Sequence, residues 1–147
     1  MAVTKENLCA FYASDYHLEM IILPYINKNL ENDKEVYIFT QNNLENTITD
    51  LIKKVNIKEE LKEKVLNINW KIDDENKYKQ LVYENKESII FVKGNEEYIN
   101  KVNNNLKDVK KYKVLKIIDC YNMEEIGTKA IDIVKNHKNI LITNKIN

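Results

Sequence analysis

Short apolar runs alternate along the chain with segments whose apolar residues recur every three or four positions. Runs of β-branched and aromatic residues are typical of buried strands, whereas the three-and-four spacing is typical of one helix face. The runs predict strands at residues 8–13, 36–40, 66–70, 88–93, 114–120 and 139–143. The run at 88–93 is almost wholly apolar, which predicts a central strand that is buried on both faces.

Between these runs, apolar residues recur every three or four positions, as on one face of a helix. This spacing predicts helices over residues 15–32, 44–55, 57–65, 74–82, 95–109 and 122–134. Pro24 lies inside the first helix and is expected to kink it. In the last helix, Met123 and Ile126 are placed on the buried face. Side chains that can cap free backbone N–H groups stand at the helix starts: Ser14, Asp74, Asn95 and Asn122.

Strand–helix alternation of this kind is typical of α/β proteins with a mostly parallel sheet. Parallel strands need crossover connections, and helices usually supply them. We therefore expect a sheet of about six strands flanked by helices on both faces, in a three-layer, Rossmann-like arrangement. The chain has 147 residues and shows no linker or internal repeat, which predicts a single domain over residues 1–147.

Charge and cysteine content narrow the range of functions. The chain has 23 basic and 23 acidic residues, and every basic residue is Lys. With zero net charge, no basic stripe and no guanidinium group to read guanine, nucleic-acid binding is not expected. Cys9 and Cys120 lie far apart, which fits a reducing compartment better than a disulfide framework. Because a signal peptide and a membrane-length apolar segment are also missing, the sequence predicts a cytoplasmic protein with no membrane contact.

Polar and reactive side chains gather where the predicted strands end. In an open α/β sheet, ligands bind outside the carboxyl ends of the strands. These ends give a candidate ligand site composed of Tyr12, Ser14, Asp15, His17, Thr40, Lys93, Cys120, Tyr121 and Asn122. The alternative is that these residues only cap helices and fill loops, since strand-to-helix loops need polar residues in any case.

Familiar catalytic and cofactor motifs are missing from the chain. A phosphate-binding loop needs a glycine-rich turn ending in Gly-Lys-Ser/Thr, whereas residues 93–95 carry one Gly after the Lys. Two Gly cannot supply a dinucleotide fingerprint, and the two His and two Cys lack zinc-type spacing. A Cys120–His17 nucleophile is the remaining enzymatic alternative, although a small buried hydrophobic role suits Cys120 better. We therefore expect no enzymatic activity, no cofactor and no metal.

Several stretches of the chain resemble one known family. They are Leu8-Cys9-Ala10-Phe11-Tyr12 with the acidic helix start, the helix containing Pro24, Cys120-Tyr121-Asn122, His137 and Ile140-Leu141-Ile142. Together they are similar to the MEDS domain, the methanogen/methylotroph DcmR sensory domain. The chain departs from that pattern at Asn7, Asn29 and Asn122, where the family has His, Gly and Asp. The resemblance implies a RecA-like fold without a working P-loop, and a sensory role beside a kinase, anti-sigma or DNA-binding component.

Three functional hypotheses follow. The first is a stand-alone sensory or regulatory domain that binds a small, partly apolar ligand at the carboxyl edge of the sheet and signals to a regulatory protein partner. The second is a protein-interaction module with no small-molecule ligand, for which an exposed apolar patch would be the mark. The third is a small Cys-dependent enzyme, which needs a Cys120 thiol with a lowered pKa.

Overall fold

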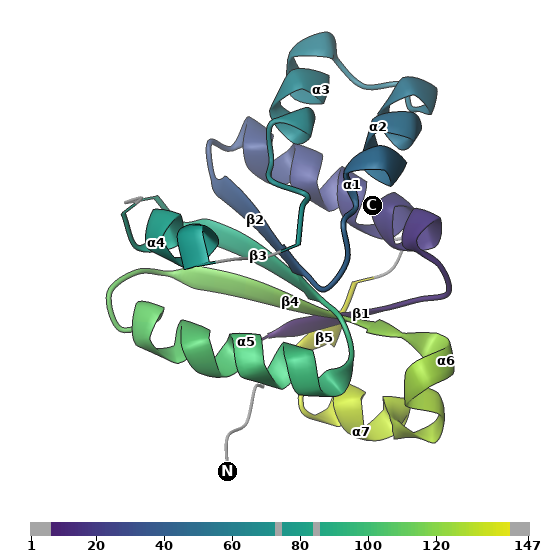
Figure 1. The fold of residues 1–147 in the computed structure, drawn as a ribbon, viewed down its shortest axis with the longest axis vertical. Coiled ribbons are helices and arrows are strands. Elements are labelled where there is room, and N and C mark those ends of the chain that lie inside the picture. The colour runs from purple at the N-terminus through teal and green to yellow at the C-terminus, as the bar shows by residue number, and fades with distance from the viewer. Residues whose placement is uncertain (1–6, 73–74, 84–85, 142–147) are drawn as a thin grey trace.

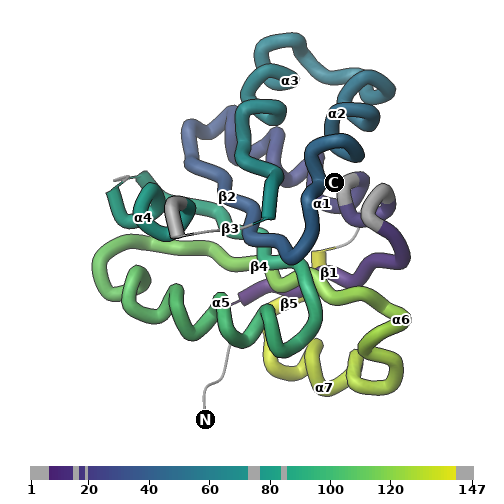
Figure 2. Tube along the Cα trace, viewed as in Figure 1, coloured from purple at the N-terminus to yellow at the C-terminus, as the bar shows by residue number. Residues whose placement is uncertain are grey.

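Five parallel strands form one sheet in the computed structural model, which describes residues 7–72, 75–83 and 86–141. The order within these residues is β2-β3-β4-β1-β5 (Figure 1). The strand bounds are β1 (Leu8–Tyr12), β2 (Glu35–Thr40), β3 (Ser88–Lys93), β4 (Leu115–Asn122) and β5 (Asn139–Ile140). Although β1 comes first in the sequence, it lies inside the sheet between β4 and β5, as the chain path in Figure 2 shows.

Helices cover both faces of this sheet (Figure 1). One face carries α1 (Asp15–Glu31), α2 (Glu45–Lys54) and α3 (Glu59–Leu66). The other carries α4 (Glu75–Tyr83), α5 (Glu96–Val109), α6 (Met123–Ile126) and α7 (Ala130–Lys135), and a 3-10 helix, η1 (Gly127–Lys129), joins α6 to α7. The architecture is three-layered, α/β and Rossmann-like, which confirms the expected fold class.

Two hydrophobic cores lie between the sheet and its helices, because strand side chains point alternately to opposite faces. On one face, Ile22 and Ile26 of α1 belong to the same buried cluster as Phe91 of β3. On the other face, Ile99 of α5 belongs to a cluster with Ile90 of β3. All six residues of β3 are buried, and β2 and β4 pair with it on either side. The prediction that residues 88–93 form a central strand is therefore confirmed.

The helix starts follow the capping residues in the sequence. The Ser14 side chain accepts a hydrogen bond from the backbone N–H of His17 at 3.1 Å, and Asn95 accepts one from Tyr98 at 2.8 Å. Asn122 caps α6 by accepting from the N–H groups of Glu124 and Glu125. Each bond satisfies a backbone donor that has no partner inside the helix. Pro24 lies within α1 as expected, whereas the expected cap Asp74 lies outside the described residues.

Two predictions about secondary structure are wrong. Residues 66–70 form no strand: Leu66 ends α3 and is 42% exposed, and the following segment runs back to the sheet without pairing to it. Gly127, with φ of 49°, ends the first turn of the last helical segment and separates α6 from α7. Met123 is consequently 53% exposed rather than part of a continuous buried face, whereas Ile126 is buried as expected.

The last strand is shorter than predicted within the described residues. The expected strand at 139–143 appears as β5, which covers Asn139–Ile140, and residues 142–143 lie outside the described part. None of the described helices has the length and apolar character needed to cross a bilayer.

Candidate functional site at the carboxyl edge

The carboxyl ends of β1 and β4 form the topological switch point of the sheet. The two strands are neighbours, and Tyr12 lies opposite Asn122 in their parallel register. From β1 the chain enters α1 on one face, whereas from β4 it enters α6 on the other (Figure 1). Connections that leave in opposite directions open a crevice between the strand ends, and ligands of open α/β sheets bind there.

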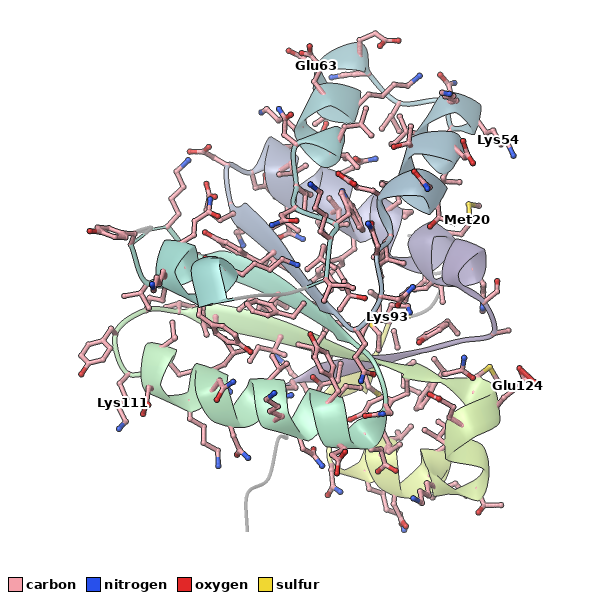
Figure 3. The ribbon with its side chains drawn as sticks, in the orientation of Figure 1. Met20, Lys54, Glu63, Lys93, Lys111 and Glu124 are labelled. Carbon is pink, nitrogen blue, oxygen red and sulfur yellow. The ribbon has the colours of Figure 1, made fainter. Side chains whose placement is uncertain are left out.

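A buried lysine ties the strand-end loops together at this edge. Lys93, the last residue of β3, is 6% exposed and is labelled in Figure 3 where the loops meet. Its ammonium Nζ lies 2.7 Å from Oδ1 of Asn42, beyond β2, and 5.2 Å from the centre of the Tyr12 ring, at the end of β1. Both contacts stabilise a cation in a partly desolvated position. Lys93 thus couples the ends of β1, β2 and β3.

The loops after β2 and β3 are also joined through Gln41 and Asn95. The backbone N–H of Asn95 donates to Oε1 of Gln41 at 2.7 Å. Gly94 permits this approach, since a Cβ there would come within 2.4 Å of the Gln41 Oε1. Thr40 is fully buried, and its Oγ1 donates to the backbone carbonyl of Asn42 at 2.9 Å. Thr40 therefore shapes its own turn and does not face the solvent.

The residues after β1 have local roles. Ser14 caps α1, and Nδ1 of His17 accepts a hydrogen bond from the backbone N–H of Ala13 at 3.0 Å. A nitrogen that accepts a hydrogen bond carries no proton, so in the neutral His17 ring the proton is on the other nitrogen, Nε2. The side chain of Asp15 lies outside the part of the chain that the structure describes.

Cys120 and Tyr121 belong to opposite cores. Cys120 packs on the α1 face together with Tyr12, and it lies opposite Lys93 in the register of β3 and β4. Tyr121 points to the other face and packs against the rings of Phe11 and His137, with centroid separations of 6.0 and 5.9 Å. Burial, followed by the charge of Asp119, raises the pKa of the Cys120 thiol. This opposes the thiolate that a Cys-dependent enzyme would need.

A cavity of about 340 Å³ opens at the same edge, between the beginnings of α5 and α6. Its lining includes Gly94 and Asn95 from the end of β3, Asn122 from the end of β4, and the apolar side chain of Ile126. Three glutamates complete it. Glu96 is paired with Lys129 at 3.0 Å, whereas Glu97 and Glu125 form no ion pair within the described residues.

The candidate residues therefore fall into separate groups. Tyr12, Lys93 and Cys120 lie on the α1 face of the sheet with Thr40 nearby, and Asn122 alone among them lines the cavity. Ser14 and His17 are joined to each other, and Tyr121 is part of the opposite core. The glutamates at positions 97 and 125 were missed, because a first-turn Glu indicates only a favourable helix-dipole interaction.

A buried polar network that includes Asp119 of β4 was also missed. One Asp119 oxygen lies 2.9 Å from Nε2 of His137 and 3.1 Å from Nδ2 of Asn7, and the other accepts from Asn103 at 2.9 Å. The side chains of Asp119 and His137 are 2% and 4% exposed. The signal in the sequence was the Asp119 carboxylate inside an otherwise apolar run, because a carboxylate is rarely buried without a partner.

The charge state of this network follows from its geometry. Both ring nitrogens of His137 face oxygen acceptors, since Nδ1 lies against the carbonyl of Ile133. Burial lowers the pKa of His137, but its hydrogen bonds to Asp119 and Ile133 and the Asp119 charge together outweigh burial and raise it. The arrangement favours an imidazolium–carboxylate pair that anchors the segment after α7 to the centre of the sheet.

Comparisons with known proteins assign neither a family nor a function to the chain. The chain matches no protein-family model, no curated protein and no solved structure. The resemblance to the MEDS domain thus remains a prediction from the residues quoted above.

Proposed function

We propose that the chain is a sensory or regulatory domain that binds a small, partly apolar molecule at the carboxyl edge of the sheet. The cavity between the starts of α5 and α6 supports this proposal, because it opens beside the switch point where α/β sheets take ligands. Its volume of about 340 Å³ falls within the range of small-molecule sites. Ile126 offers an apolar wall, and Glu97 and Glu125 would attract an amino group or another hydrogen-bond donor.

The signalling step would be a shift between two arrangements of the edge loops. A ligand changes such an equilibrium only if it binds one arrangement more tightly than the other. The element best placed to respond is α6, which has four residues and is followed by the positive-φ Gly127. A regulatory protein, such as the kinase, anti-sigma or DNA-binding component that the MEDS resemblance implies, would then bind one arrangement preferentially.

Native mass spectrometry tests the proposal directly. The full chain, purified gently from its own cells, should carry a stoichiometric excess mass that disappears on denaturation. Replacing both Glu97 and Glu125 by Gln should remove this excess. The change Glu63→Gln, at an exposed position of α3 away from the cavity, should leave the excess mass in place. A bare chain mass, or an excess that survives the double change, contradicts ligand binding in this cavity.

One observation favours the interaction module as a second candidate. On α4, Val82 and Tyr83 are 62% and 88% exposed, and they line an apolar hollow with Tyr78. Exposed aromatic and aliphatic groups that adjoin one another mark interaction surfaces. In the same experiment, a co-purifying protein that is lost on Tyr83→Ser but kept on Tyr112→Ser would support this function. Tyr112 is a matched control because it is similarly exposed, at 84%.

A further inference from the structure

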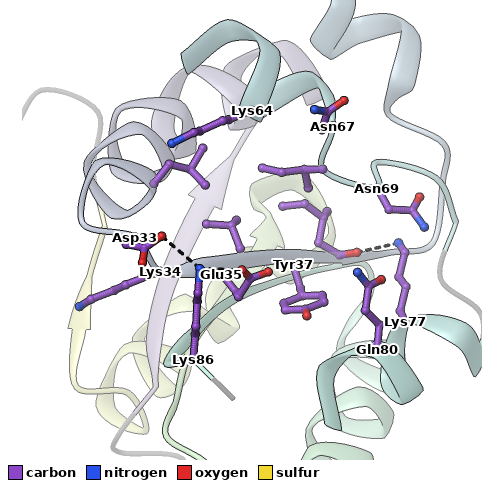
Figure 4. A pocket seen from close by; sticks show the side chains of 14 residues that line it. Asp33, Lys34, Glu35, Tyr37, Lys64, Asn67, Asn69, Lys77, Gln80 and Lys86 are labelled. Atoms are coloured by element: carbon purple, nitrogen blue, oxygen red, sulfur yellow. Dashed lines mark hydrogen bonds and ion pairs between the residues drawn. The ribbon is translucent and has the colours of Figure 1, made fainter. Parts of the chain in front are cut away.

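A second cavity, of about 360 Å³, lies beside β2 and away from the carboxyl edge (Figure 4). It borders the outer edge of β2, which pairs with no other strand among the described residues. The turn after α1, the end of α3 and helix α4 surround it. Leu30, Val36 and Ile68 supply apolar surface within the lining. The volume suits a small organic molecule, and the site is independent of the function proposed above.

Lysines outnumber carboxylates in the described lining of this cavity. Asp33 and Glu35 both face the ammonium of Lys86, at 3.1 and 3.7 Å, as Figure 4 shows for Asp33. Lys34 is paired with Glu87 at 3.2 Å. Asp33 and Glu35 share one ammonium, but the lining carries four Lys against these two carboxylates, so its net charge favours an anion.

The polar groups that remain available are mainly hydrogen-bond donors. The Lys64 ammonium has no ion pair within the described part of the chain, and the side-chain amides of Asn67 and Gln80 form no hydrogen bond there. All three side chains are labelled around the cavity in Figure 4. Asn69 uses its Oδ1 to accept from the Lys71 N–H at 3.0 Å, so its amide N–H₂ can still donate.

A buried charge lies at the base of the same cavity. Lys77 is 3% exposed, and its ammonium donates to the carbonyls of Ile38 and Lys71 at 2.7 and 2.6 Å. The bond to Ile38 holds α4 against the outer edge of β2. It also places an almost fully buried ammonium in the lining of the cavity.

We propose that this cavity binds a small amphipathic organic anion. The head group, a carboxylate or a phosphate monoester, would accept hydrogen bonds from Lys64 and the neighbouring amides. The hydrocarbon part would lie along Leu30, Val36 and Ile68. Lysine is suited to either head group, because its ammonium acts as a point charge and needs no matching fork geometry.

Titration of the ¹⁵N-labelled full chain with sodium hexanoate and, separately, with hexyl phosphate tests this site by NMR. At least one of these anions should cause saturable shifts of the amides of Val36, Ile68 and Gln80, and the one that binds identifies the head group. 1-Hexanol and inorganic phosphate should cause much smaller shifts at the same concentrations. Lys64→Gln should weaken binding about fivefold, the loss expected for one accessible charge-assisted hydrogen bond.

The control change is Lys53→Gln, which removes the same charge from an exposed position of α2 outside the cavity and should leave binding unaltered. The proposal is overturned if neither amphipathic anion causes saturable shifts at the cavity. It also fails if hexanol binds as tightly, if inorganic phosphate gives the same pattern, or if Lys64→Gln binds like the unchanged chain.

Discussion

At the scale of single residues, Asp119 and His137 form a buried pair whose atoms lie 2.9 Å apart. Both side chains are almost fully buried, and Asn7 and Asn103 also donate to the carboxylate. Removing one partner from such a pair leaves an uncompensated buried charge, which costs about 3–5 kcal/mol. The network joins residues from both ends of the described chain and should strongly influence stability.

This pair predicts that stability depends on pH in a definite direction. The pKa of His137 is raised in the folded chain. Its contribution is therefore fully present below the unfolded value of about 6.5 and is lost as pH rises through the folded pKa. Urea unfolding followed by circular dichroism should show stability falling across that window, after allowance for other groups. In His137→Gln, stability should depend less on pH across this window. At pH values below the window, this change should lower the free energy of unfolding by about 3 kcal/mol.

The chain supplies a matched control, because it has two histidines. His17 is only partly buried, and its Nδ1 accepts from a backbone N–H rather than facing a carboxylate. His17→Gln leaves the pair of Asp119 and His137 in place, so at acidic pH it should remain more stable than His137→Gln. If the His137→Gln profile has the same slope as the unchanged chain, His137 does not gain a proton on folding.

A second prediction at this scale concerns Trp70. This residue is 1% exposed, and its Nε1 donates to the carbonyl of Val65 at 2.8 Å, near the end of α3. Trp70→Phe removes the indole donor from that carbonyl, which also accepts from the Ile68 N–H at 3.2 Å, and it removes packing volume, so it should destabilise by about 2 kcal/mol. Circular dichroism in urea measures the loss, while the change Tyr112→Phe on an 84% exposed side chain should leave stability nearly unaltered. An unchanged midpoint for Trp70→Phe would contradict the anchoring role.

At the scale of elements, hydrophobic periodicity predicts most of the helices and all five described strands to within a few residues. It fails at residues 66–70, where Leu66, Ile68 and Trp70 alternate with two Asn and so imitate a strand. The alternation has a different origin in the structure. Leu66 ends α3 and is exposed, whereas Trp70 is buried through its bond to Val65. Five residues cannot distinguish a strand from a helix end followed by a packed connection.

Local sequence patterns also predicted only part of the candidate site. Strand ends could be located from the sequence, but the face to which each side chain points depends on a boundary that is uncertain by a residue or two. The predicted strand ended at Cys120, whereas β4 continues to Asn122, so strand alternation places Cys120 and Tyr121 in opposite cores. The pairing of Asp119 with His137 depends on strand order, which no local pattern reveals.

Capping of α5 gives a prediction about a whole element. Asn95 accepts from the Tyr98 N–H at 2.8 Å, so Asn95→Ala should lower stability by about 1 kcal/mol in a urea unfolding experiment. Asn95→Asp keeps an acceptor and should retain most of that stability. Asn104→Ala, the same change on the exposed middle of α5, should be neutral or slightly stabilising because Ala is the better helix former. Equal losses at positions 95 and 104 would argue against the cap.

At the scale of the whole molecule, the order of the sheet determines how firmly each strand is held. β4 pairs with β3 over residues 115–120 on one side and with β1 over residues 118–122 on the other. β1 has β4 on one side, but on the other only β5, through two residue pairs. Short edge strands with exposed side chains open more readily than central ones. We therefore expect the β5 side of the sheet to open locally while β4 remains folded.

The two cysteines report on this difference, because Cys9 lies in β1 and Cys120 in β4. Both are fully buried, and burial together with Asp119 raises the pKa of Cys9 to about 11 and that of Cys120 still further. Neither thiol should react with iodoacetamide until its strand opens. Release of β5 uncovers Cys9, whose Sγ lies 3.7 Å from the Asn139 carbonyl, whereas Cys120 needs global unfolding. Peptide-level mass spectrometry should therefore find Cys9 alkylated at least about tenfold faster under native conditions, and both cysteines alkylated at similar rates in urea. Equal native rates would mean that the sheet opens as one cooperative unit.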